Sequence, residues 1–205
     1  WFYWAFCVEG AQGQTLTFHF DKKWLGYYGP GVRHDLYNWK WQNEEAAPAA
    51  SDTFTYTFDK DESCVWFAHN MLYHPAHFDA FCKELGLEQL TLCKSERGRD
   101  VPYVRFGKGD EQIILTARHH ACEATGTYVL EGVVRELLRE PIPNTEVVVV
   151  PFVDYDGVVD GDQGKARAPF DHNRDYRFDE TAIYATVRAI QKIAADKPLR
   201  YAFDF

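Results

Sequence analysis

The sequence predicts an N-terminal all-β sandwich followed by an α/β domain whose sheet has helices on both faces. Three observations support this prediction. Short segments of period-two alternation, separated by breaks, fill the region before about residue 74. Beyond it, apolar strands alternate with long helical patterns. The chain has 205 residues and is 46% hydrophobic, which excludes a disordered protein.

The sandwich is assigned to residues 1–73. Alternation is clearest in Thr53–Phe58, and further strands are expected at Trp1–Glu9, Thr15–Phe20 and Glu62–His69. Breaks at 10–13, 29–31 and 43–51 separate the strands. Aromatic side chains of this region are expected in the sandwich core, although such rings can also stack on sugars; they are Trp1, Trp4, Trp24, Tyr27, Tyr28, Tyr37, Trp39 and Trp41.

Residues 74–205 are assigned to the α/β domain. Helices are expected at Pro75–Leu85, which Gly86 ends, at Glu123–Arg139 and at Thr181–Ala195. The run Glu146–Phe152 is continuously apolar, as in a strand buried on both faces. The other expected strands are Leu90–Ser95, Val101–Phe106, Gln112–Ala117 and Leu199–Phe205.

Charge and cysteine content restrict the function. A net charge of -9 argues against a nucleic-acid binder, and no apolar run is long enough to predict a membrane helix. Five cysteines without C-x-x-C spacing favour free thiols and a reducing, cytoplasmic location. Both ends read as strands cut off without a turn, so we expect the chain to be a segment of a longer polypeptide. The oligomeric state cannot be inferred from the sequence.

Two loops carry groups suited to chemistry, and open α/β sheets place sites in such loops. His120 and Glu123 lie three residues apart after an apolar strand, and imidazole plus carboxylate is an ordinary pair of zinc ligands. The alternative is that they only begin a helix, with Glu123 complementing its dipole. A further acidic loop containing Asp154, Asp156, Asp160 and Asp162 is expected to be solvated.

The second loop contains Asn173 and Arg174. An amide beside a guanidinium is a good anchor for a carboxylate, because the guanidinium can form two parallel hydrogen bonds with it. The alternative is a surface arginine paired with Asp171 or Asp175.

Together the loops resemble the zinc carboxypeptidase family (peptidase family M14), and its cytosolic-carboxypeptidase-like branch in particular. The resemblance covers nearly the whole chain and rests on Arg118–Glu123, on Asp156-Gly157 and on Asp171–Arg174. It departs from the usual motifs, because H-P-G-E, N-P-D-G and D-L-N-R are HACE, DYDG and DHNR here. The resemblance implies a mixed sheet flanked by helices, with the C-terminal part of the domain missing.

The resemblance also implies roles. His120 and Glu123 would be two of the three protein ligands of one Zn²⁺ ion, and Asn173 with Arg174 would hold the C-terminal carboxylate of a peptide or protein. The family also uses an arginine to stabilise the oxyanion. Gly164 stands near that position here, so Arg167 is the candidate, with Lys165 as the second choice.

The implied activity is hydrolysis of a C-terminal peptide bond. The third ligand, a histidine, is expected beyond Phe205, as is the catalytic glutamate. This segment alone is therefore expected to be inactive and to bind zinc weakly, if at all. Two alternatives stay open: a zinc-dependent amidohydrolase acting on N-acyl amino acids, and a non-catalytic binding module that has kept the fold.

Overall fold

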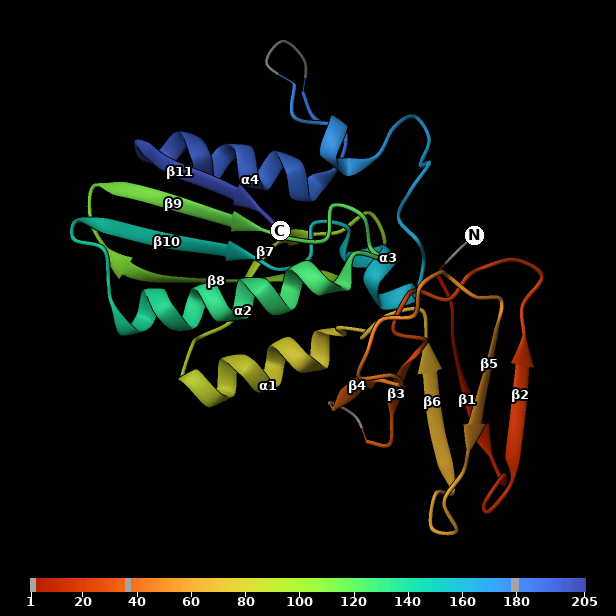
Figure 1. The fold of residues 1–205 in the computed structure, drawn as a ribbon. Helices are drawn as coiled ribbons and strands as arrows, with labels where there is room; N and C mark the ends of the chain where they lie inside the picture. Colours follow the sequence, from red (N-terminus) through yellow and green to blue (C-terminus); the bar gives the residue numbers. More distant parts are fainter. Residues whose placement is uncertain (1–2, 36–37, 178–180) are drawn as a thin grey trace. The chain divides into compact units, whose positions relative to one another are not determined.

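The computed structural model describes residues 3–35, 38–177 and 181–205 (Figure 1). The chain divides into two compact units, Trp1–Leu72 and Tyr73–Phe205, which are described separately below. Trp1, Phe2 and Tyr37, to which the sequence predictions refer, lie outside the described residues. Within the described part of the chain, no helix is both long enough and apolar enough to span a membrane.

The first unit consists of two antiparallel sheets. The strands of the larger sheet follow the spatial order β1-β6-β3-β4, and β2 pairs with β5 in the smaller one. Their bounds are β1 Ala5–Glu9, β2 Thr15–His19, β3 Gly31–Arg33, β4 Trp39–Trp41, β5 Thr53–Thr57 and β6 Cys64–Ala68.

One hydrophobic cluster joins the two sheets of this unit. Phe67 of β6 lies within 5.5 Å, ring centre to ring centre, of both Phe18 on β2 and Phe54 on β5. Aromatic contacts across a core are what the period-two patterns predict, and the sandwich is confirmed. The expectation that all the aromatics are core was wrong for Tyr27 and Tyr28, which are 54% and 42% exposed.

The second unit is built on a five-stranded mixed sheet of order β11-β9-β10-β8-β7. Strand β9 runs parallel to β10 and β11, whereas β8 is antiparallel to β10 and to β7. The bounds are β7 Leu90–Lys94, β8 Asp100–Lys108, β9 Glu111–Thr116, β10 Thr145–Val150 and β11 Leu199–Asp204. Because β9, β10 and β11 run parallel, their C-terminal ends lie at the same edge of the sheet.

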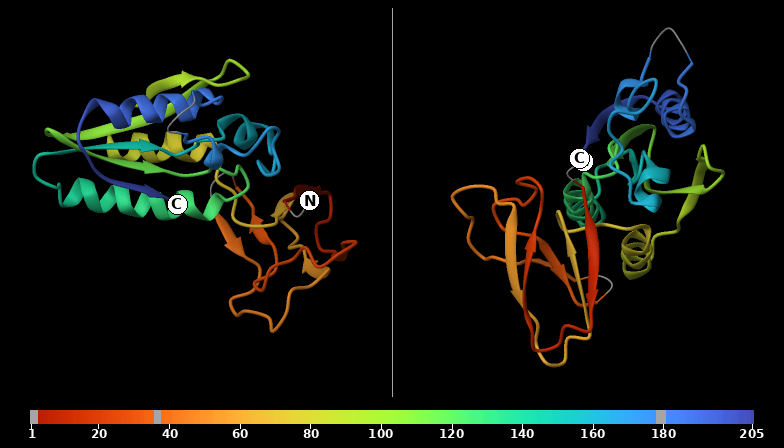
Figure 2. Two further views of the ribbon diagram at one scale, coloured as in Figure 1. Left: turned by 90° about the horizontal axis from the view of Figure 1, so that it is seen from above. Right: turned by 90° about the vertical axis from the view of Figure 1, so that its right-hand side faces the viewer.

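Helices cover both faces of this sheet (Figures 1 and 2). Helices α1 (Pro75–Leu85) and α2 (Ala124–Arg139) pack on one face, where Ile113 and Leu115 point. Helix α4 (Ala185–Asp196) packs on the other face, against Ile114 and its neighbours. Alternate residues of one strand thus enter different cores, which explains the continuously apolar runs.

Three features departed from the sequence prediction. Strands β3 and β4 have three residues each, too few for a periodic pattern. Short helices α3 (Tyr155–Asp160) and η1 (His172–Arg174) fall in segments that read as loops. Helix α4 begins at Ala185 rather than Thr181, because Asp175 accepts the amides of Ile183 and Tyr184 (3.1 and 2.8 Å) and holds them outside the helix.

Candidate metal and substrate site

The loop that joins β9 to α2 carries the predicted ligands at the shared edge of the parallel strands. It is bound to the loop after β10 by backbone hydrogen bonds: Ala117 donates to Val150 (3.1 Å), and Val153 donates to Ala117 (3.0 Å). The amide of Asp154 donates to the Arg118 carbonyl at 2.9 Å. The two loops therefore form one continuous platform.

His120 and Glu123 meet on this platform. Nδ1 of His120 lies 3.0 Å from Oε2 of Glu123, and Nε2 of the same ring lies 3.4 Å from Oδ2 of Asp171. Both ring nitrogens thus face a carboxylate. Sequence reasoning treated Asp171 only as a possible partner of Arg174, because nothing in a linear pattern shows that residue 171 returns to residue 120.

Lys165 is the cation nearest the ligand pair, with Nζ 2.8 Å from Oε1 of Glu123. Burial acts to raise the pKa of Glu123, but hydrogen bonds from Lys165 and His120 outweigh it and hold the pKa below its usual value. Glu123 is therefore an anion at neutral pH, as a metal-ligating carboxylate must be.

Arg167, the other oxyanion candidate, is engaged by two carboxylates. Its Nε and Nη2 donate to Oδ2 of Asp154 (3.0 and 2.6 Å), and its Nη1 lies 3.1 Å from Oδ2 of Asp162. Burial raises the pKa of Asp154 in spite of this ion pair. These contacts hold Arg167 in the platform, and its assignment to an oxyanion remains a prediction.

The expectation of a solvated acidic loop was wrong for Asp154. Asp154 is 2% exposed, and as the N-cap of α3 its other oxygen accepts the amide of Gly157 (3.0 Å). Asp156 and Asp160 both pair with Arg99 (3.0 and 2.7 Å). Arginines distant in sequence neutralise these carboxylates, and the side chains of Asp160 and Asp162 remain partly exposed.

Arg118 stabilises the loop that joins β9 to α2, which carries the predicted ligands. It is 1% exposed with a left-handed backbone (φ 62°), and its guanidinium donates to the carbonyls of Ala121 (2.8 Å) and Tyr73 (2.9 Å). These bonds fix the turn on which His120 stands. The resemblance includes Arg118, but residue type alone did not reveal its buried, positioning role.

Gly164 lets a third segment approach the ligand loop. A Cβ built at Gly164 would lie 2.3 Å from the amide nitrogen of Ala121, and the backbone there has a φ of 72°. A side chain at this position would push the segment away from the loop.

We expect Gly164→Ala to destabilise the chain by about 2 kcal/mol more than Gly161→Ala does. Both glycines have positive φ (72° and 70°), but a Cβ at Gly161 meets nothing within 4 Å. The Gly161 variant therefore suffers backbone strain alone, about 1 kcal/mol, whereas Gly164→Ala adds a steric clash. Urea unfolding measures both. Equal losses would show that the close approach contributes nothing.

The anchor pair stands on η1, directly after Asp171. Asn173 and Arg174 are both exposed, and Arg174 forms no ion pair with any described residue. Asp175, the alternative partner of Arg174, is instead buried and caps the segment before α4. The guanidinium of Arg174 thus forms no ion pair within the described part of the chain and lies exposed. The contact between Asp171 and His120 brings the two predicted loops together.

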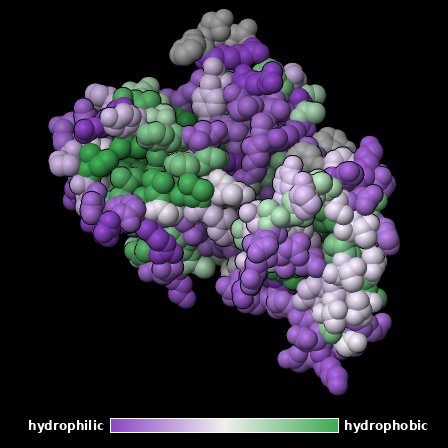
Figure 3. Space-filling model, viewed as in Figure 1, coloured by the Kyte–Doolittle hydropathy of each residue, from purple (hydrophilic) through white to green (hydrophobic). Residues whose placement is uncertain are grey.

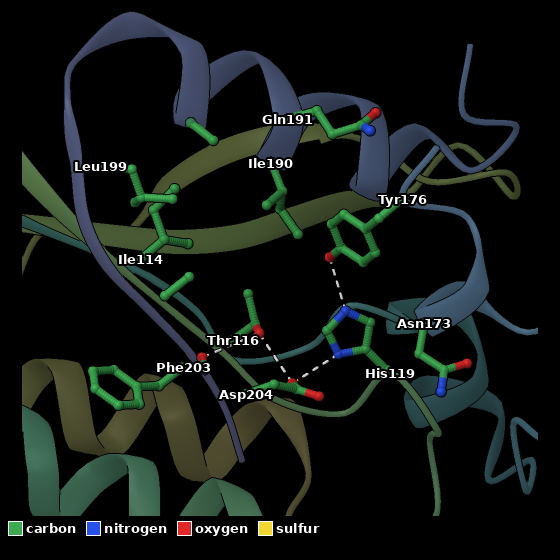
Figure 4. Close-up of a pocket in the computed structure, with 12 residues that line it drawn as sticks. Ile114, Thr116, His119, Asn173, Tyr176, Ile190, Gln191, Leu199, Phe203 and Asp204 are labelled. Atoms are coloured by element: carbon green, nitrogen blue, oxygen red, sulfur yellow. Dashed lines mark hydrogen bonds and ion pairs between the residues drawn. The ribbon is translucent and has the colours of Figure 1, made fainter. Parts of the chain in front are cut away.

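Asn173 also lines a pocket of about 380 Å³ beside α4 and β11 (Figure 4). His119, which precedes His120 in the chain, lines this pocket and lies between two partners. Its Nδ1 lies 2.7 Å from Oδ1 of Asp204, and its Nε2 lies 2.8 Å from the Tyr176 hydroxyl. The sequence offered no signal for this group, because its members come from three separate segments.

Strand β11 presents apolar side chains beside this pocket. Leu199 and Phe203 are 45% and 51% exposed, and Figure 3 shows a hydrophobic area on this unit. His172, on η1, is buried and stacked on Tyr184 with ring centres 3.7 Å apart. Burial lowers the pKa of His172 to about 4, so its ring is neutral at neutral pH.

The residues present fit a zinc ion. Nitrogen and oxygen ligands bind zinc at about 2.0–2.2 Å, so two of them on one tetrahedral ion are about 3.4 Å apart. The 3.0 Å between His120 and Glu123 is close to this spacing. A carboxylate on the far nitrogen of a ligating histidine is the usual partner that orients it, and Asp171 occupies that position.

No protein-family model matches the chain. In sequence, it is 24% identical over 181 residues to cytosolic carboxypeptidase 2 of Danio rerio, covering 75% of this chain and 25% of the relative. It is 25% identical over 150 residues to cytosolic carboxypeptidase 2 of Xenopus tropicalis. That match covers 61% of this chain and 15% of the relative. The chain thus spans a quarter or less of these relatives.

Solved structures show the fold. A metallo-carboxypeptidase from Burkholderia cenocepacia matches 98% of this chain and 60% of its own, with a TM-score of 0.76 and 18% identity. A metallo-carboxypeptidase from Pseudomonas aeruginosa, in complex with (2-guanidinoethylmercapto)succinic acid, matches with a TM-score of 0.74 and 21% identity. This match covers 98% of this chain and 59% of the Pseudomonas chain. Both matches include the sandwich and the mixed sheet. The chain is thus similar in sequence to cytosolic carboxypeptidases and has the fold of metallo-carboxypeptidases.

Proposed function

We propose that this chain supplies part of the active site of a zinc metallocarboxypeptidase, an enzyme that hydrolyses the C-terminal peptide bond of a peptide or protein. The observation that carries the proposal is the approach of His120 Nδ1 to Glu123 Oε2 (3.0 Å), with Asp171 behind the ring. His120 and Glu123 are the proposed ligands of one zinc ion. When bound, zinc polarises the scissile carbonyl and lowers the pKa of a coordinated water.

The chain's own residues bind and orient the substrate. Arg174, exposed and without an ion pair to the described residues, receives the terminal carboxylate, and the Asn173 amide adds a donor. Lys165, 2.8 Å from Glu123, is the cation closest to the ligands, and we propose it beside Arg167 for the oxyanion. Its nearness to the proposed ligands favours Lys165, whereas the donor groups of Arg167 face Asp154 and Asp162.

Two ligands are fewer than catalytic zinc ordinarily uses. Within the described residues, no third histidine, cysteine or carboxylate joins His120 and Glu123 in a set whose ligand atoms are all mutually close. We propose that the third ligand and the general base come from the longer protein, and that these 205 residues alone hydrolyse no peptide.

The solved structures support a carboxypeptidase over an amidohydrolase of N-acyl amino acids. Their match includes the sandwich that precedes the α/β unit in the sequence. The names of the sequence relatives support a cytoplasmic location and a peptide or protein C-terminus as substrate.

Replacing Arg174 by alanine tests the anchor. We expect it to weaken binding of a peptide with a free C-terminal carboxylate by about 10- to 100-fold, because a charge-assisted, bidentate pair is lost. The same peptide with an amidated C-terminus should bind both proteins weakly and equally. Isothermal titration calorimetry measures all four combinations.

Arg139→Ala is the matched control, since Arg139 is also exposed but pairs with Glu136 and Glu140 at the end of α2. It should leave peptide affinity unchanged. If the wild-type chain does not distinguish the free carboxylate from the amide, the anchor assignment fails.

A further inference from the structure

Two cysteines of the sandwich stand together, away from the proposed zinc site. Sγ of Cys7 lies 2.6 Å from Sγ of Cys64, although 57 residues separate them in the chain. Cys7 is on β1 and Cys64 on β6, and the register pairs Cys7 with Trp66 and Cys64 with Glu9. The thiols are thus diagonal neighbours on two paired strands.

Both thiols lie on the face of the sheet that is turned away from the sandwich core. Residues next to them in sequence, Phe6 and Val65 among them, point into the core, so Cys7 and Cys64 point out. Trp66 on the same face is 38% exposed. The cysteines themselves are half-buried, which leaves them accessible to a small reagent. Strand β1 is also the edge of its sheet.

The separation of the sulfur atoms distinguishes two uses of such a pair. Glu9 completes a set of three potential metal ligands with the two thiols. Zinc–sulfur bonds of about 2.3 Å place two thiolates on one tetrahedral ion about 3.8 Å apart. A disulfide needs about 2.05 Å. The observed 2.6 Å is nearer to the disulfide, so a metal would have to push the sulfurs apart by about 1 Å.

We propose that Cys7 and Cys64 form a reversible disulfide that ties the edge strand β1 to β6 when the chain meets a peroxide. The bond is a covalent modification site of the sandwich unit and does not depend on the function proposed for the other unit. The other cysteines lie elsewhere: Cys82 and Cys122 are buried, and Cys93 is on β7.

The chemistry balances with hydrogen peroxide as oxidant. We assign the first attack to the Cys64 sulfur, because burial and the neighbouring Cys64 sulfur raise the pKa of Cys7 to about 11. The Cys64 thiol attacks one oxygen of the peroxide, becomes a sulfenic acid and releases the other oxygen as water with its proton. The Cys7 sulfur then attacks the Cys64 sulfur, and the departing hydroxide leaves as water with the Cys7 proton. Two electrons pass from the sulfurs to the peroxide.

The whole reduced chain, treated with equimolar hydrogen peroxide, tests this directly. Peptide mapping without reductant should yield one linked pair, Cys7 with Cys64, lighter than the separate peptides by two hydrogen atoms. Dithiothreitol should restore both thiols. Thermal unfolding of the oxidised chain should shift upward by about 10 °C for the sandwich transition, because a long loop is closed.

Cys64→Ser should abolish the link and the shift, whereas Cys93→Ser, the matched control, should leave both intact. Should a variant fold poorly, mapping of the wild-type chain decides by itself. Alkylation of both thiols after peroxide treatment, with no linked peptide, overturns the proposal. So does stoichiometric zinc on the reduced chain that Cys64→Ser removes, which would make the pair a metal site.

Discussion

In a protein extended to include the proposed third ligand, His120→Ala is expected to weaken zinc binding by more than about 100-fold. Loss of an outer-shell partner alone costs about 10- to 100-fold in metal affinity, and here a ligand is removed. Competition with a chromophoric chelator at neutral pH measures the change. The measurement is best made with Cys64→Ser in every protein, so that the thiol pair and Glu9 add no zinc site of their own.

The same series distinguishes ligand from orienting residue. Asp171→Asn should cost about 10-fold, because it leaves His120 in place but weakens the group behind its ring. His19→Ala, on an exposed strand of the sandwich, is the control and should change nothing. Zinc bound equally by the His120 variant and its parent would remove the metal assignment and favour a binding module on the same fold.

Arg118→Met is expected to lower the free energy of unfolding by about 3 kcal/mol. The side chain is 1% exposed and donates to two buried carbonyls, those of Ala121 and Tyr73. Methionine fills part of the space but donates no hydrogen bond, and an unsatisfied buried acceptor costs about 1–3 kcal/mol. Urea unfolding at neutral pH, followed by circular dichroism, measures the loss.

Arg200→Met is the matched control, because Arg200 pairs with Glu111 at 3.2 Å on a partly exposed surface. Such a pair contributes at most about 1 kcal/mol. The Arg118 variant should also lose zinc affinity even where it remains folded, since Arg118 fixes the turn that carries His120. A variant as stable as the parent would show that the loop holds its shape without the guanidinium.

Local patterns in the sequence predicted much of the fold. The alternation in Thr53–Phe58 and the apolar run Glu146–Phe152 were confirmed as strands, and the helix expected at Glu123–Arg139 begins one residue later. Each of these signals comes from neighbours along the chain, since burial on one face or on both imposes a period that can be read directly. Elements such as β3 and α3 were not predicted, because they are too short to show a period in the sequence.

The residue types of the candidate site were likewise evident from the sequence: an imidazole and a carboxylate three residues apart, and an amide beside a guanidinium. Only the tertiary structure decided how these groups meet. The carboxylate of Asp171 reaches His120 across 51 residues of chain, Arg118 is buried under the loop it supports, and the Cys7 and Cys64 sulfurs lie in contact. Contacts of this kind depend on strand order and loop packing, which bring distant segments to one edge of a sheet and leave no periodic trace in the sequence.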